Sequence, residues 1–271
     1  MKLDERLKEK FLKQKSKNIF KYIYYFFQKL KKDKYIKKSY SGGAIDLIVD
    51  YHFRDKKKGI YIDVGAYHPF KSSNTYKLFS RGWCGINIDL DYQTIDIFNH
   101  FRPNDENICA AISDITAEKE LFFHHNRSTI NTLEAKLGHR AKEIKRLKTT
   151  TLNNIIENSK FKNSELDFLS IDVEGHELNV IKGLDLEKYP IKIIVIEYQD
   201  PKMKKVEFYN QDIERTIQSD IYNYMKSKNY VLINWLHSDL VFINKVTLTR
   251  GLKRPLSSDL IALCIVPSWG E

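Results

Sequence analysis

The sequence predicts an α/β fold with a doubly wound, mainly parallel sheet that ends in one antiparallel strand. Short apolar runs, many of them β-branched, alternate with amphipathic helical segments along most of the 271 residues. The most β-branched run, 191–196, stands between Pro190 and Glu197. The last two strand-like runs are separated only by the turn His237-Ser-Asp239, which predicts a C-terminal hairpin.

The expected elements follow one another in a regular order. Strands are predicted at 60–64, 84–88, 107–112, 166–171, 191–196, 230–236 and 240–244, with an edge strand at 121–123. Helices are predicted at 44–53, 93–101, 152–158, 178–184 and 213–227, with a charged helical insertion at 132–147. The cluster 72–75 is predicted to cap a further helix that runs through Phe79. Breaks such as Ser41-Gly-Gly43 and Arg81-Gly82 separate neighbouring elements, and residues 245–271 are harder to place.

The composition predicts one main domain over residues 41–271. With 42% hydrophobic residues, 11 Gly and 6 Pro, the chain can bury one sizeable core. Its cysteines, Cys84, Cys109 and Cys264, are far apart, so neither a disulfide framework nor a zinc knuckle is expected. The N-terminus lacks an apolar region followed by a small-residue cleavage site. We therefore expect a cytoplasmic protein.

The positive charge is concentrated before the main domain. Residues 1–38 contain 14 Lys or Arg and 4 Asp or Glu, which accounts for the whole net charge of +10. The remaining residues are neutral overall, so a basic groove for nucleic acid is not expected in the main domain.

Residues 1–40 are predicted to form a basic amphipathic helical extension. Leu12, Ile19, Ile23, Phe26 and Leu30 recur at near-helical spacing, with lysines between them. A helix that spans a bilayer needs roughly 20 apolar residues, and this run is shorter and interrupted by lysine. Three roles stay open: packing on the domain or in a homodimer, contact with the inner face of the membrane or a glycosyltransferase, and a nucleic-acid arm.

The strand 60–64 ends in a turn that favours a cofactor without phosphate. In open α/β sheets, ligands bind beyond the carboxyl ends of the strands. The turn Gly65-Ala-Tyr-His-Pro69 has one glycine and a proline, whereas NAD binding uses G-x-G-x-x-G. Asp89 ends the next strand, where an acid can accept both hydroxyls of a ribose. S-adenosylmethionine carries cationic groups and no phosphate, so it suits this arrangement. Asp63 either orders the turn near the methionine moiety or only caps its own loop.

Four segments together resemble the FkbM family of S-adenosylmethionine-dependent methyltransferases. They are Tyr61-Ile-Asp-Val-Gly-Ala-Tyr-His-Pro69, Ser73-Asn-Thr75, Arg81-Gly-Trp83 with Gly85-Ile86, and Ile171-Asp-Val-Glu-Gly-His-Glu177. The resemblance runs from about residue 41 to 244 and implies a class I methyltransferase (Rossmann-like) fold with a seven-stranded sheet. It also implies methyl transfer to a hydroxyl oxygen, commonly on a sugar of a bacterial surface glycan or a natural product.

The resemblance also implies which residues bind the cofactor. They are Asp63, Gly65, Ala66, Tyr67, Asn74 and Asp89, with Ile112 and Ser113 beside the adenine. The family often has Glu-Pro after the second strand, whereas this chain has Asp89-Leu90 and so keeps the acid but not the proline ring.

The turn 172–177 follows the fourth strand of the main sheet and is expected to border the same crevice as Gly65. Methylation of an alcohol requires loss of the hydroxyl proton as the oxygen attacks the sulfonium methyl group, and a carboxylate or histidine can act as the base. A metal can instead lower the pKa of the hydroxyl. The candidate catalytic residues are Asp172, Glu174, His176, Glu197 and His237.

A divalent metal, Mg, Mn or Fe(II), held by Asp172, His176 and Glu197, is one hypothesis for this site. Glu174 and Glu177 can instead interact with the dipole of the following helix. His124, His125 and Arg127 are candidates to line the acceptor site, where Arg127 is available for the phosphate of a nucleotide-sugar.

These observations predict an O-methyltransferase that acts on a nucleotide-linked or polymer-linked sugar in bacterial capsule or lipopolysaccharide biosynthesis. One alternative is an NAD-dependent sugar-modifying enzyme, which the missing second and third glycines disfavour. Another is a non-enzymatic glycan-assembly adaptor with the same fold. RNA methylation is disfavoured by the neutral main domain and by the lack of an Asn-Pro-Pro-Tyr-like turn after the fourth strand.

Overall fold

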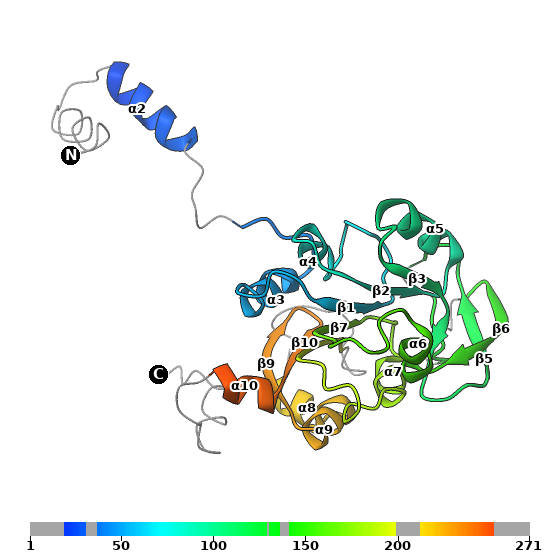
Figure 1. The fold of residues 1–271 in the computed structure, drawn as a ribbon. Helices are drawn as coiled ribbons and strands as arrows, with labels where there is room; N and C mark the ends of the chain where they lie inside the picture. Colours follow the sequence, from blue (N-terminus) through cyan, green and yellow to red (C-terminus); the bar gives the residue numbers. More distant parts are fainter. Residues whose placement is uncertain (1–18, 31–36, 129, 136–140, 199–211, 252–271) are drawn as a thin grey trace. The chain divides into compact units, whose positions relative to one another are not determined.

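The computed structural model describes residues 19–30, 37–128, 130–135, 141–198 and 212–251 (Figure 1). The chain divides into two units, residues 1–38 and residues 39–271. In the first unit, the expected amphipathic helix is present as α2, Ile19–Leu30. Two other parts of the predicted extension, residues 1–18 and 31–36, lie outside the described residues. Its Tyr22, Ile23 and Phe26 side chains are exposed. Within the described ranges, no helix has the length and apolar character needed to cross a membrane.

The second unit is built on a seven-stranded sheet with the order β3-β2-β1-β7-β8-β10-β9. The strands are β1 Ile60–Val64, β2 Cys84–Asp89, β3 Glu106–Cys109, β7 Phe168–Ile171, β8 Ile193–Glu197, β9 Tyr230–Leu236 and β10 Asp239–Asn244. Neighbours from β3 to β8 run parallel, and β10 is antiparallel to both β8 and β9. The predicted α/β, mainly parallel fold and its C-terminal hairpin are confirmed.

Helices cover both faces of this sheet (Figure 1). Alternate residues of each strand face opposite sides, as Tyr61 and Ile62 do in β1. The buried cluster on one face of the sheet includes residues of α3, Ile45–His52, and of α4, Tyr76–Ser80. The cluster on the other face includes residues of three helices: α6, Leu152–Asn158; α7, Glu177–Lys182; and α9, Asp220–Ser227. The other helices are α5 Tyr92–Phe101, α8 Ile213–Gln218 and α10 Lys245–Gly251.

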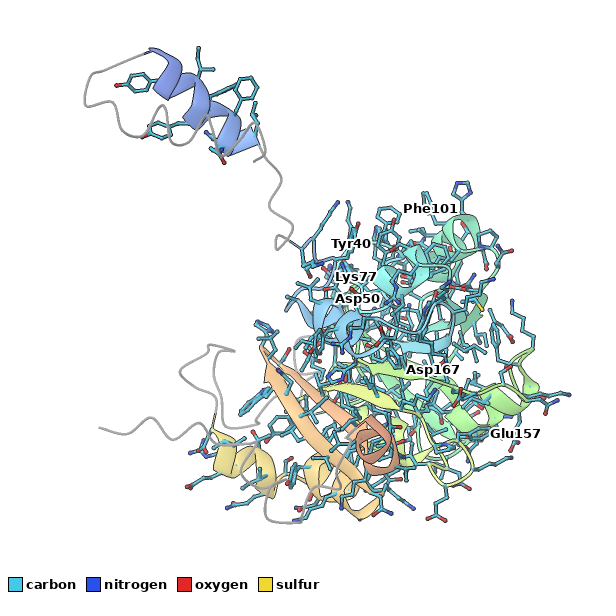
Figure 2. All side chains as sticks on the ribbon, turned by 60° about the vertical axis from the view of Figure 1, so that its left-hand side comes forward. Tyr40, Asp50, Lys77, Phe101, Glu157 and Asp167 are labelled. Carbon is cyan, nitrogen blue, oxygen red and sulfur yellow. The ribbon has the colours of Figure 1, made fainter. Side chains whose placement is uncertain are left out.

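The main domain begins with residues that are bonded to its first helix. Ser39 Oγ donates to Asp46 Oδ1 at 2.6 Å, and the Tyr40 backbone N–H donates to Asp46 Oδ2 at 2.8 Å. The Tyr40 ring lies under the Lys77 ammonium group, 5.8 Å from the ring centroid (Figure 2). The segment after residue 38 is therefore part of the packed unit.

Three predicted elements differ in the structure. The run 107–112 is not one strand, because β3 ends at Cys109 and the chain leaves the main sheet after Ala110, whose N–H donates to the Asp89 carbonyl at 3.0 Å. Residues Ala111–Ile112 form β4, which pairs with β6, Glu143–Thr150, in a separate three-stranded sheet with β5, Glu118–Phe123. The predicted helix 213–227 is divided into α8 and α9 by Ser219, whose side chain caps α9.

The predicted helical insertion at 132–147 is wrong for the described residues. Residues 143–150 form β6, and Thr132 makes an isolated bridge to Phe122, while 136–140 lie outside the described residues. In β6, Ile144 is 57% exposed and the backbone pairs with β5. Non-local strand pairing thus overrides the local pattern.

A fully buried arginine, Arg102, fixes the loop that follows β1. Its Nε donates to the Pro69 carbonyl at 3.0 Å, and its Nη1 donates to Thr75 Oγ1 at 2.9 Å. Thr75 in turn donates to Asp63 Oδ2 at 2.6 Å. These hydrogen bonds connect Arg102, at the end of α5, with Pro69 and Thr75 in the loop after β1 and, through Thr75, with Asp63 in β1 itself.

Candidate functional site

A cavity of about 330 Å³ lies at the carboxyl ends of β1, β2 and β7. Its apolar wall includes Ile88, Leu90, Ala110 and Ile112, and its polar wall includes carboxylates. Among the predicted cofactor residues, Gly65, Tyr67, Asp89 and Ile112 line it. The position agrees with the general location of ligand sites in open α/β sheets.

Gly65 allows the turns after β1 and β7 to approach each other. Its φ is +78°, in the region that favours glycine, and a Cβ atom there would lie 1.7 Å from the carbonyl oxygen of Asp172. The Gly65 and Ala66 backbone N–H groups donate to the Ile88 carbonyl at 2.9 and 3.1 Å. Any side chain at this position would therefore push apart the two turns that border the cavity.

Two aspartates, Asp89 at the end of β2 and Asp91 just after it, form the next part of the wall. Asp89 Oδ2 accepts from the Tyr67 N–H at 3.0 Å, and Asp89 Oδ1 accepts from the Asp91 N–H at 2.8 Å. Burial raises the pKa of Asp89. Asp91 also lines the cavity and caps α5 by accepting from the Gln93 N–H at 2.8 Å. Asp91 is not among the site residues predicted from the sequence.

The other predicted cofactor residues stand behind the wall. Asp63 is buried against Thr75, and burial raises its pKa to about 6. Ala66 is also buried, and Asn74 Nδ2 donates to Ser170 Oγ at 3.1 Å. Ser113 Oγ donates to Asp114 Oδ1 at 2.8 Å. These four residues do not line the cavity, so their contacts support the turns that do.

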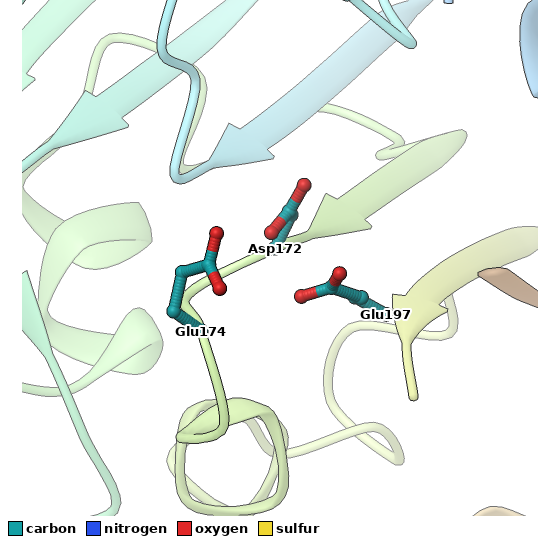
Figure 3. Close-up of side chains that lie close together, drawn as sticks. All are labelled: Asp172, Glu174 and Glu197. Carbon is teal, nitrogen blue, oxygen red and sulfur yellow. The ribbon is translucent and has the colours of Figure 1, made fainter. Parts of the chain in front are cut away.

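Three candidate catalytic carboxylates meet at one point. Asp172 and Glu174 from the turn after β7 and Glu197 from the end of β8 point toward one another (Figure 3). One oxygen from each lies within 4.8 Å of the others. Asp172 and Glu174 also line the cavity. Asp172, taken as a whole residue, is more exposed than Glu174 or Glu197.

A fourth carboxylate, Asp239, enters this cluster from the hairpin. It is the register partner of Glu197 across β8 and β10. Burial, followed by repulsion from Glu197, raises the pKa of Asp239 to about 7. Burial and Glu197 likewise raise the pKa of Glu174 to about 8 and the pKa of Asp172 well above its usual value. From the sequence, Asp239 is predicted only as part of a turn, because the pairing of β10 with β8 is not visible in a linear pattern.

His176 lies behind the cluster instead of inside it. Its Nδ1 is 2.5 Å from Glu134 Oε1, and its Nε2 is 2.9 Å from Ser113 Oγ. Burial lowers the pKa of His176. Since both ring nitrogens have protein partners, the described residues that could hold a metal are Asp172, Glu174 and Glu197, with Glu174 in the place expected for His176.

Two further acidic or basic candidates have local roles. Glu177 Oε1 accepts from the Val173 N–H at 3.1 Å and the Gly175 N–H at 2.8 Å, so it closes its own turn. His237 lies in the β9–β10 turn with Nδ1 3.2 Å from Ser238 Oγ, and it does not line the cavity.

The comparison with known families agrees with this geometry. The family model for the FkbM methyltransferase domain matches residues 63–232, from the acid in β1 to the middle of β9. That segment is more than half of the chain and contains Gly65, Asp89, the 172–177 turn and Glu197. A search of curated proteins found no match to the chain. The sheet order, the position of the cavity and this match show that the chain belongs to the FkbM methyltransferase family.

Proposed function

We propose that the protein is an S-adenosylmethionine-dependent O-methyltransferase that acts on a sugar hydroxyl. The observation that carries the proposal is that a carboxylate cluster and a candidate ribose-binding acid, Asp89, lie on one cavity. The chemistry of the lining fits the cofactor. Ile88, Leu90 and Ile112 offer apolar contact for a purine, and the acids favour the cationic sulfonium and ammonium groups.

S-adenosylmethionine would supply a methyl group on a positively charged sulfur. The residues of this chain would then have to bind the acceptor, orient its hydroxyl and remove the proton. Asp172 is suited to the last task because it lines the cavity in which the acceptor would bind. The raised pKa of this carboxyl group, caused by burial and by Glu197, makes it a stronger base than an ordinary aspartate once it is ionised.

The cofactor proposal is tested by ligand-induced stabilisation. S-adenosylhomocysteine is expected to raise the melting temperature of the full chain, by an amount that grows with ligand concentration, whereas NAD is expected to have no effect. Stabilisation by NAD would instead favour a dehydrogenase or epimerase. Binding of neither compound in calorimetry would favour an adaptor without catalytic activity.

The acceptor proposal, a nucleotide-linked or polymer-linked sugar of a capsule or lipopolysaccharide, needs a separate measurement. Mass spectrometry of surface glycan from a strain that lacks the protein is expected to reveal the loss of one methyl group. An unchanged glycan would refute the sugar assignment and leave the cofactor assignment intact.

We further propose that Asp172, Glu174 and Glu197 can hold a divalent cation, because they offer the oxygen ligands that Mg²⁺ and Mn²⁺ prefer. Such a cation would lower the pKa of an acceptor hydroxyl bound beside it. Fe(II) is less suited to these three carboxylates than to the ligand set predicted from the sequence, because that set included the imidazole of His176, which is not in the cluster.

The cluster predicts that stability depends on pH and on the cation. Burial raises the pKa of Glu174 to about 8 and that of Asp239 to about 7, so the folded state holds these protons more tightly than the unfolded state. Their stabilising contribution is complete below the unfolded carboxyl pKa and is lost as the pH rises through 7 to 8. In chelator, the melting temperature should fall between about pH 4, the carboxyl pKa of the unfolded chain, and about pH 8, the highest of the raised pKa values. Added Mg²⁺ or Mn²⁺ should offset the fall.

The variant Glu174→Gln tests whether the cluster causes this dependence on pH and on the cation. The variant should show a weaker fall with pH and a smaller response to the cation, because one charge of the cluster is removed. If chelation and Mg²⁺ or Mn²⁺ addition leave the wild-type melting temperature and transfer rate unchanged, the cation proposal is refuted.

A further inference from the structure

Arg127 is the only lysine or arginine that lines the cavity among the residues that the structure describes. The charged side chains around it are acidic: Asp89, Asp91, Asp172 and Glu174. An acidic cavity suits the cationic groups of the proposed cofactor but repels any carboxylate or phosphate of a bound molecule. Arg127 is therefore the described position where an anionic oxygen group would be attracted.

The backbone around Arg127 holds this side chain at the cavity. Arg127 has a φ of +55°, an uncommon conformation for a residue with a side chain. Its backbone N–H donates to Asp91 Oδ2 at 2.5 Å. In the same loop, Asn131 accepts from the His124 N–H at 2.8 Å and donates to the His125 carbonyl at 3.0 Å. The main chain, not an ion pair of the guanidinium group, thus binds the loop to Asp91.

The guanidinium group of Arg127 retains an unused donor. Its Nε is buried and has no hydrogen-bond partner among the described residues. A buried N–H group without a partner is unfavourable, so an acceptor that reaches it gains a strong interaction. Arginine presents its N–H groups in a planar fork that matches the two oxygens of a carboxylate or phosphate.

We propose that Arg127 binds an oxyanion of a molecule held in this cavity, and this inference rests on the proposed function. This oxyanion can be the carboxylate of the methionine moiety of the cofactor or a phosphate group of a nucleotide-linked acceptor. In either case Arg127 determines ligand specificity, because it attracts an anionic group into a cavity whose other charged side chains are acidic.

Calorimetry with the full chain and its Arg127→Gln variant tests the proposal with three probes. S-adenosylhomocysteine has the carboxylate, 5′-methylthioadenosine lacks the whole amino-acid moiety, and inorganic pyrophosphate represents the acceptor phosphate. If Arg127 binds the cofactor carboxylate, the variant should bind S-adenosylhomocysteine at least tenfold more weakly and 5′-methylthioadenosine with unchanged affinity. If it binds an acceptor phosphate, only pyrophosphate binding should be lost.

Other outcomes would overturn the inference. An unchanged affinity of the variant for S-adenosylhomocysteine and pyrophosphate would refute it, and an equal loss for both adenosyl compounds would show contact with adenosine or loss of the loop structure. Arg146→Gln, an exposed arginine on β6, is the matched control and should bind all three probes as wild type does. If the wild-type protein binds neither adenosyl compound, the proposed cofactor site itself is refuted.

Discussion

Replacing Asp172 with asparagine is expected to lower the rate of methyl transfer by about 10²–10⁴-fold, the range typical for loss of a general base. Asparagine keeps the shape of the side chain but cannot accept the hydroxyl proton. The affinity for S-adenosylhomocysteine, the coproduct of methyl transfer, should change little, because Asp172 is proposed to act on the acceptor hydroxyl and not on the cofactor. Single-turnover rates with the acceptor and calorimetry with S-adenosylhomocysteine measure the two quantities.

The melting temperature separates loss of chemistry from loss of folding. Because Asp172 lies close to Glu174 and Glu197, removing its charge should relieve repulsion and raise the melting temperature in chelator. Asp96→Asn, at an exposed position on α5, should leave both rate and stability unchanged. A variant at Asp172 that is folded and fully active would show that the base is another residue.

Replacing Arg102 with methionine is expected to lower the free energy of unfolding by about 3–5 kcal/mol, as is typical when one partner of a buried charged network is removed. The methionine would leave the Pro69 carbonyl without its donor and the buried Asp63 without a nearby cation. It would also release the bond to Thr75 that fixes the loop after β1. Urea unfolding of both proteins, followed by circular dichroism, measures the difference.

An exposed arginine provides the control for this measurement. The Arg54 side chain is 57% exposed and pairs only with Asp55 among the ion pairs of the described residues, so Arg54→Met should change stability by no more than about 0.5 kcal/mol. If Arg102→Met costs less than about 1 kcal/mol, the buried network is not a major source of stability, and the loop must be held by its other contacts.

Local patterns in the sequence predicted the fold because strand and helix periodicities reflect burial of neighbouring side chains. The apolar run 60–64 and the turn at Gly65 are of this kind, since a short apolar run followed by glycine predicts a strand that ends in a turn. The position of Asp89 at a strand end also predicted that it would lie on the cavity.

The same reasoning failed where pairing is non-local. Residues 143–150 have no strong alternation, and their strand structure depends on hydrogen bonds with β5 and β4. Asp239 joins the carboxylate cluster only because β10 pairs with β8.

The amino-acid sequence by itself determined the α/β class, the glycine turn, the acid at the end of β2 and the acidic turn after β7, because each depends on residues adjacent in the chain. Only the tertiary structure decided which side chains of these turns face one another. Glu174, with φ +57°, joins Asp172 and Glu197, whereas His176 turns away to Glu134 and Ser113. These orientations follow from backbone bends and from partners more than 20 residues distant, whose contacts no local spacing encodes.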